Sequence, residues 1–256
     1  MTDRYCIIIP NYNHTTHIEQ VLKRISAYEL PVIMVNDGSD STTNDFLIAL
    51  NDKYDFLELL HLEQNQGKGG AVMTGLRHAQ QNGYTHAIQV DADGQHAISD
   101  VPKFIQLSKD TPEAVVCGIP DYDQSVPLGR LIPRYITHFW VWVETLSFRI
   151  KDSMCGFRLY PLANTIDLID QSSIGKRMDF DTEILVKLDW RNVPIINLPT
   201  RVTYPDDGSS HFQMFRDNWL ITKMHTRLFF GMLPRAPKLI ARHFKHTKAK
   251  KNNHER

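Results

Sequence analysis

Residues 85–96 read THAIQVDADGQH, and this stretch decides the fold. It opens with a short apolar run that ends at Val90, and a continuous run of this kind is typical of a strand buried on both faces of a parallel sheet. Asp91 and Asp93 follow at once. Because open parallel sheets bind ligands at the carboxyl ends of their strands, we expect chemistry at these two carboxylates.

Further apolar runs repeat this form, and segments with helical periodicity separate them. The predicted strands are Tyr5–Ile9, Val32–Val35, Leu57–Leu62, Thr85–Val90 and Ala114–Cys117. Apolar residues recur at helical spacing from Ile18 to Ile25, and again from Ile98 to Ile105. This alternation predicts an α/β fold, with a mostly parallel sheet flanked by helices.

The regular alternation stops near residue 118. Beyond it, the sequence predicts two helices and then a strand, at Arg134–Ile150, Asp181–Trp190 and Val193–Val202. We therefore expect one main domain, residues 1–215, whose halves are 1–118 and 119–215. Residues 216–256 are expected to form a separate segment, an amphipathic helix followed by a basic tail.

Basic charge is concentrated at the C-terminus. Lys and Arg match Asp and Glu over the whole chain, 29 to 29, yet residues 234–256 hold eight basic residues and one acidic residue. A protein built to coat nucleic acid would spread such charge over its body, so no nucleic-acid partner is expected. The basic end and the apolar run Trp219–Leu233 before it suit an anionic membrane surface, and a core-packed helix is the alternative.

Signals for export and for membrane spanning are not evident. The first residues lack the pattern of a secretory signal, and the longest apolar stretch, Tyr135–Val143, is far shorter than the ~20 residues that a spanning helix needs. Cys6, Cys117 and Cys155 lack the paired spacing of a disulfide or zinc framework. We expect a cytoplasmic protein that is peripheral on the cytoplasmic membrane face.

Polar turns follow the first four predicted strands. They are residues 10–13 (PNYN), 36–39 (NDGS), 65–70 (NQGKGG) and 91–96 (DADGQH). Asp91 and Asp93 can share Mg²⁺ or Mn²⁺ and leave positions open for diphosphate oxygens, although a capped turn before a helix has the same pattern. The glycine-rich turn is neither a Rossmann fingerprint nor a P-loop. Its amides and Lys68 could receive an anion at the start of the next helix, and a flexible turn is the alternative.

Five motifs occur in the order found in one enzyme family. They are residues 9–13 (IPNYN), 35–40 (VNDGSD), 65–70 (NQGKGG), 91–96 (DADGQH) and 155–158 (CGFR). Over roughly residues 5–210 the chain resembles the family 2 glycosyltransferases with the GT-A fold, especially the branch similar to dolichol-phosphate mannose synthases. The resemblance implies an inverting, metal-dependent transfer of a sugar from a UDP- or GDP-linked donor to a lipid-linked or glycan acceptor, with Mn²⁺ or Mg²⁺ as cofactor.

Roles for individual residues are implied by the resemblance, and those of the residues at strand ends agree with their placement. Donor binding is expected of Pro10, Asn11, Tyr12, Asp37, Lys68, Asp91 and Arg158. Metal binding is expected of Asp93, Gln95 and His211. Two of these have plain alternatives, because Arg158 could instead form a structural ion pair and His211 could be a surface histidine.

A carboxylate on the acceptor side would serve as the catalytic base. Asp181 is the favoured candidate, with Asp179 and Glu183 behind it, because the family places such a group near this segment. The alternative is that these acids only complement the dipole at the start of a helix. A hydroxyl acceptor needs such a base, whereas a phosphate acceptor is already anionic.

The chain departs from the family at two places, and other functions stay open. Asn13 stands where the family commonly has Glu, and residues 206–211 (DDGSSH) stand where polyprenyl-phosphate mannosyltransferases tend to carry basic residues. The second departure speaks against a plain polyprenyl phosphate acceptor. The alternative functions are a sugar-phosphate nucleotidyltransferase, which would need a Gly-rich basic loop after the first strand, and a catalytically silent binding protein of the same fold.

Overall fold

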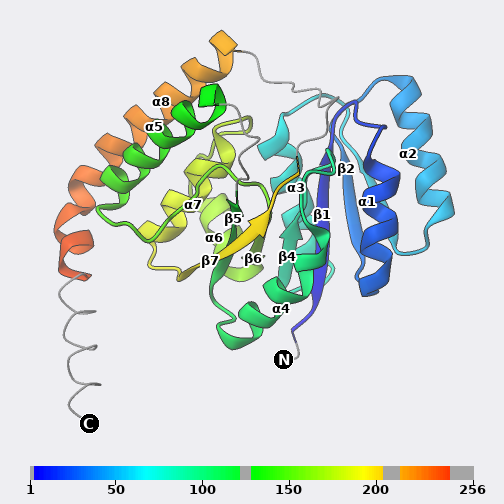
Figure 1. The fold of residues 1–256 in the computed structure, drawn as a ribbon, viewed down its shortest axis with the longest axis horizontal. Coiled ribbons are helices and arrows are strands. Elements are labelled where there is room, and N and C mark those ends of the chain that lie inside the picture. Colours follow the sequence, from blue (N-terminus) through cyan, green and yellow to red (C-terminus); the bar gives the residue numbers. More distant parts are fainter. Residues whose placement is uncertain (1–2, 122–127, 204–213, 243–256) are drawn as a thin grey trace.

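The structure is a computed structural model, and it describes residues 3–121, 128–203 and 214–242. Seven strands form one sheet in the order β3-β2-β1-β4-β6-β5-β7, and helices cover both of its faces (Figure 1). The strands are β1 (Tyr5–Asn11), β2 (Val32–Asn36), β3 (Leu57–His61), β4 (His86–Gln89), β5 (Val115–Asp121), β6 (Arg158–Pro161) and β7 (Ile195–Arg201). The helices are α1 (Ile18–Ile25), α2 (Ser41–Lys53), α3 (Lys68–Gln81), α4 (Val101–Asp110), α5 (Leu128–Thr145), α6 (Leu162–Gln171), α7 (Phe180–Trp190) and α8 (Met214–Met232).

The sheet is parallel except at β6. This strand runs antiparallel to both of its neighbours, β4 and β5, whereas the other strand pairs are parallel. Its first residue, Arg158, is therefore paired with Gln89, the last residue of β4. The reversed strand thus brings residues 155–157 to the edge where the parallel strands end.

Alternation along β1 explains why helices cover both faces. Cys6 and Ile8 belong to a core shared with α3, α6 and α7, whereas Ile7 and Ile9 belong to a core shared with α1, α2 and α4. All four side chains are fully buried. A strand with two buried faces has to be apolar throughout, which accounts for the continuous runs in the sequence.

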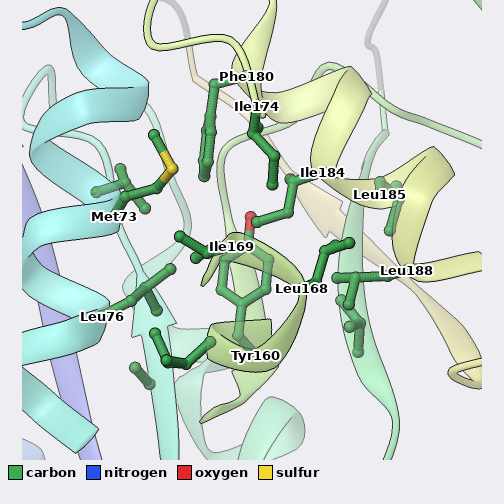
Figure 2. Close-up of a cluster of buried hydrophobic side chains, with 14 of the residues drawn as sticks. Met73, Leu76, Tyr160, Leu168, Ile169, Ile174, Phe180, Ile184, Leu185 and Leu188 are labelled. Atoms are coloured by element: carbon green, nitrogen blue, oxygen red, sulfur yellow. The ribbon is translucent and has the colours of Figure 1, made fainter. Parts of the chain in front are cut away.

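The first of these cores fixes the start of α7 beside the start of α3. Figure 2 shows Met73 and Leu76 of α3 extending towards Ile169 of α6 and towards Phe180, the first residue of α7. A Cβ atom at Gly69 would collide with the Phe180 side chain. The two helix N-termini can therefore approach closely only because this position is glycine.

Helices α5 and α8 lie side by side at the end of the molecule opposite α1 and α2 (Figure 1). Their inner faces are buried at Val141, Met224 and Leu228. Their outer faces expose large apolar side chains, namely Tyr135, Ile136, Phe139, Trp140, Phe215, Trp219 and Phe230. Helix α8 therefore packs on the core with one face and exposes large apolar side chains on the other. Within the described ranges, no helix is both long and apolar enough to cross a membrane.

Buried carboxylates fasten α5 and α8 to each other and to the core. Glu144 of α5 is fully buried, and its Oε1 lies 2.7 Å from Nδ1 of His225 in α8. Asp189 of α7 is also fully buried and pairs with Arg149 at 2.6 Å and with Arg242 at 2.5 Å. Removing one partner would leave an uncompensated buried charge, so these pairs favour a single arrangement of the helices.

Most elements agree with the sequence predictions. The five predicted strands before residue 118 are present, with boundaries that differ by at most four residues, and so are α1, α4, α7 and β7. The prediction missed β6 and α6. The expected aromatic helix begins earlier, at Leu128, and it ends at Thr145 because Leu146 adopts a left-handed conformation with φ 48°.

Candidate active site

Asn13 joins the turns that follow β1 and β2. Its backbone N donates to Ser39 Oγ at 3.0 Å, and its side-chain Oδ1 accepts from the backbone N of Asp40 at 2.9 Å. Asn13 has φ 53°, a left-handed conformation that Asn adopts more readily than Glu. The backbone conformation of this turn therefore suits Asn at position 13.

The other expected donor contacts in the first turn differ in exposure. Asn11 is buried, and its side chain hydrogen-bonds both backbone groups of His14, at 2.8 and 3.3 Å. Pro10 is partly buried, whereas Tyr12 exposes 36% of its surface. Asn11 therefore shapes this turn, and Tyr12 is the member of the trio that is most open to a ligand.

Asp37 links the turn after β2 to the glycine-rich loop. Its Oδ1 accepts from the backbone N of Gln66 at 2.7 Å, and its Oδ2 accepts from the backbone N of Gly67 at 2.9 Å. Burial raises the pKa of the Asp37 carboxyl group above its ordinary value, and these two hydrogen bonds oppose that shift. Both carboxylate oxygens are engaged by backbone amides, so Asp37 positions the loop.

Lys68 lies at the centre of the site, at the first residue of α3. Its Nζ is 2.9 Å from Asp91 Oδ2 and 2.9 Å from Asp181 Oδ2, so it joins the end of β4 to the first turn of α7. Gly156 packs against this cluster. A Cβ atom there would lie 2.5 Å from Asp91 Oδ2 and 2.6 Å from Lys68 Nζ. A larger residue at position 156 would displace this ion pair.

The charges in this cluster stabilise one another. Burial by itself would raise the pKa of Asp91, but Lys68 and His96, whose Nε2 lies 3.3 Å from Asp91 Oδ2, hold that pKa well below its usual range. Burial by itself would lower the pKa of Lys68, but Asp181 and Asp91 raise it above its usual range. Asp91 and Lys68 are therefore ionised at neutral pH.

Residues 91–96, the acidic loop after β4, form a turn that lies beside the end of β7. The backbone N of Gln95 donates to Asp93 Oδ1 at 3.0 Å. His96 is buried and stacks on Phe157, with ring centroids 5.1 Å apart. The backbone N of Thr203, just after β7, donates to the carbonyl oxygen of Gln95 at 3.0 Å. His211, the third expected metal ligand, lies outside the described residues.

Arg158, for which a phosphate clamp and a structural ion pair are the two expectations, is held by backbone oxygens. The side chain is fully buried, and its guanidinium donates to the backbone oxygens of Asp181 and Ser153. Gln89 lies beside it and donates to Asp181 Oδ1 at 3.3 Å. The buried guanidinium of Arg158 therefore supports the backbone of Asp181, and its expected contact with a donor phosphate stays a prediction.

The three acids of residues 179–183 have different surroundings. Asp181 belongs to the Lys68 cluster. Asp179 accepts from the backbone N of Arg177 at 3.1 Å, and burial raises its pKa. Glu183 is fully buried and pairs with Lys187 at 2.8 Å and Arg227 at 2.6 Å. Such enclosure places Glu183 out of reach of a substrate.

Residues 176 and 177 were missed by the sequence analysis. Lys176 Nζ donates to Gln66 Oε1 at 3.2 Å, and Arg177 Nη1 donates to Asn65 Oδ1 at 3.3 Å. With Lys68, these cations make the glycine-rich loop suitable for a diphosphate. His96 was missed as a partner of Asp91. For Lys176 and Arg177, the one signal in the sequence was that two adjacent basic residues shortly precede Asp179.

The acidic loop fits a divalent cation with open coordination. Asp91 Oδ1 is buried and accepts no hydrogen bond from any residue that the structure describes, and Asp93 uses one of its two carboxylate oxygens in the turn. Among those residues, no group of three or more His, Cys, Asp or Glu side chains is gathered as a closed metal site. Mg²⁺ commonly binds through one or two carboxylates, with phosphates and water completing its shell. The oxygen donors here suit that arrangement.

A match to a protein family identifies the family of this chain. Residues 6–174 match the model of a family described as glycosyl transferase family 2. The chain belongs to this family. Among similar proteins, a dolichyl-phosphate beta-glucosyltransferase of Dictyostelium discoideum is 27% identical to this family 2 chain over 252 residues, which cover 88% of the chain and 75% of that protein.

Solved structures of glycosyltransferases share the fold of this family 2 chain. A glucosyl-3-phosphoglycerate synthase of M. tuberculosis superposes with a TM-score of 0.64 at 15% identity, covering 91% of this chain and 80% of that one. A mannosyltransferase of Pyrobaculum calidifontis in complex with GDP-Man and Mn²⁺ gives 0.56 at 16% identity, covering 93% and 74%. The expected GT-A fold is thereby confirmed.

Proposed function

We propose that this chain transfers a sugar, with inversion, from a UDP- or GDP-linked donor to a phosphate-bearing lipid at the cytoplasmic face of a membrane. The observation that carries the proposal is the position of Lys68 between Asp91 and Asp181, at the edge where the strands end. In this proposal residues 1–118 bind the donor and residues 119–215 receive the acceptor. The C-terminal segment 216–256 contacts the membrane.

The donor's diphosphate would lie between the glycine-rich loop and the acidic loop. Lys68 and Arg177 supply positive charge on one side, and Tyr12 offers the nucleoside a partly exposed ring. Asp93 and Gln95 would hold Mn²⁺ or Mg²⁺ on the other side, and His211 stays a candidate third ligand. A bound cation would neutralise negative charge that develops on the departing diphosphate.

A phosphate acceptor agrees with the surroundings of Asp181. Its Oδ2 pairs with Lys68 and its Oδ1 accepts from Gln89, so neither oxygen is available as a strong base. A phosphate oxygen is anionic and needs no base, whereas a hydroxyl does. The Dictyostelium relative is named for dolichyl phosphate, which outweighs the acidic residues 206–211 as a guide to the acceptor. With a phosphate acceptor, Asp181 serves to hold the Lys68 side chain in place, and Asp179 supports the loop at Arg177.

A membrane-bound acceptor agrees with the outer faces of α5 and α8. Phe215, Trp219 and Phe230 are 92%, 60% and 64% exposed on α8, and Tyr135 is 62% exposed on α5. Contiguous exposed apolar side chains mark surfaces that bind proteins or membranes. The basic residues near 234–256 would add attraction to anionic lipid.

Transfer to a lipid phosphate tests the proposal directly. The full chain would be incubated with Mn²⁺, anionic vesicles containing polyprenyl phosphate, and labelled UDP-glucose, UDP-N-acetylglucosamine or GDP-mannose in turn. We expect label in the organic phase with one donor, no transfer after chelation of the metal, and at least about 100-fold slower transfer by Asp93→Ala. Asp52→Ala, which removes an exposed carboxylate of α2, is the matched control.

Each other outcome contradicts a named part of the proposal. Transfer of the sugar to the hydroxyl of polyprenol, in place of polyprenyl phosphate, would indicate that Asp181 acts as the catalytic base. Nucleotide-sugar binding without any transfer would favour the silent binding protein. A preference for a nucleoside triphosphate with a sugar phosphate would favour the nucleotidyltransferase, an alternative that gains no support from the family match.

A further inference from the structure

A buried carboxylate of α7 connects α8 to the loop over the donor site. Glu183 is fully buried, and its Oε2 accepts from Arg227 Nη2 of α8 at 2.6 Å. The same oxygen accepts from the backbone N of Gly175 at 2.8 Å. Arg227 is half exposed, whereas Glu183 has no contact with solvent, so the guanidinium reaches inward to complete the pair.

Gly175 opens a segment, residues 175–179, that packs on the glycine-rich loop. The carbonyl oxygen of Lys176 accepts from the backbone N of Gly70 at 3.0 Å. This packing has little free space, because a Cβ atom at Gly67 would lie 2.5 Å from the same carbonyl oxygen. A shift of Gly175 would therefore move residues that contact the glycine-rich loop directly.

An equivalent connection runs from α5 to the other side of the site. Asp152 is 2% exposed, and its Oδ2 pairs with Arg134 Nη2 of α5 at 2.5 Å. Its Oδ1 accepts from the backbone N atoms of Met154 and Cys155, at 2.9 and 2.8 Å. Gly156, the next residue, is the one that packs against Asp91 and Lys68.

We propose that Glu183 and Asp152 are positioning residues, through which α8 and α5 set the geometry of the donor site. Each carboxylate pairs with a basic side chain of the outer helix, and each accepts a hydrogen bond from at least one backbone amide of a loop that contacts the Lys68 cluster or the glycine-rich loop. The arrangement of the outer helices thereby controls donor affinity through these two carboxylates. This inference rests on the proposed donor site.

Arg227→Met tests the connection with the least risk to folding, because this side chain is half exposed. We expect the Kd of the nucleotide sugar, measured by calorimetry on the full chain, to rise about five- to tenfold. Arg227→Lys restores a cation beside Glu183 and should recover most of the affinity. Lys223→Met, which removes a cation 5.3 Å from the Trp219 ring on the same helix, should leave Kd unchanged.

Two further readouts separate positioning from general destabilisation. Binding is measured well below the unfolding midpoint of each variant, so a purely structural loss would lower that midpoint without raising Kd. Amide hydrogen exchange should speed up at Gly175 and Gly70 in Arg227→Met. If the native chain binds nucleotide sugar and Arg227→Met binds it equally well, the inference fails. If the native chain binds none, the proposed function fails first.

Discussion

The sheet edge that carries the site and the outer layer of α5 and α8 place their charges in opposite ways. At the sheet edge, Lys68, Asp91 and Asp181 converge on a partly open cluster, close to where strands end and helices begin. In the outer layer and in α7 beneath it, carboxylates such as Glu144 and Glu183 are fully buried and paired, while the exposed surface carries large apolar side chains beside basic ones such as Lys223. The charged groups at the sheet edge are thus arranged to meet a ligand, whereas those of the outer layer hold helices in place.

The largest effect should come from the sheet edge. Asp91→Asn keeps the shape of the side chain but removes the charge that faces Lys68 and His96. We expect kcat to fall by about 10² to 10³-fold, because such a change removes electrostatic organisation around the reacting diphosphate. Steady-state rates at saturating donor would measure this loss.

Glu144→Gln provides the matched change in the outer layer. It too neutralises a carboxylate, but a fully buried one whose partner is His225 of α8. The unfolding midpoint should fall while kcat at 25 °C stays nearly unchanged. If Asp91→Asn and Glu144→Gln lost kcat equally, the sheet edge and the outer layer would not differ in their effect on catalysis.

The sheet edge could be predicted from the sequence because its residues adjoin strand ends. Asp91 and Lys68 lie beside elements whose periodicity is plain, and parallel strands bring their carboxyl ends together. By contrast, β6 has only four residues and runs antiparallel to its neighbours. No local pattern in the sequence therefore indicated that Arg158 would be buried at this edge. The outer-layer pairs were equally hidden, because Glu144 and His225 are 81 residues apart and look like ordinary surface residues in sequence.

Acid should weaken the outer layer through Asp152. Burial would raise the pKa of this carboxyl group, but His138 and Arg134 hold it well below its usual range. A lowered pKa contributes stability above the unfolded value of about 4, and that contribution is lost as the pH falls through the folded value. Asp152→Asn should therefore cost about 3 kcal/mol near pH 7 and less at pH 3. Chemical denaturation at both pH values would measure the difference, and parallel pH profiles for the two proteins would contradict it.

The smallest effect on the folded protein should come from the outermost aromatic residues. Phe215 is 92% exposed, so Phe215→Ser should change the free energy of unfolding by no more than about 0.5 kcal/mol. Binding to anionic vesicles should nevertheless weaken about five- to tenfold, since inserting such a ring into lipid removes its apolar surface from water. Ile48→Ser, on α2 at the opposite end of the molecule, removes a 40% exposed apolar side chain and should leave vesicle binding unchanged. Equal vesicle binding by both variants in a sedimentation assay would show that Phe215 does not contact the membrane.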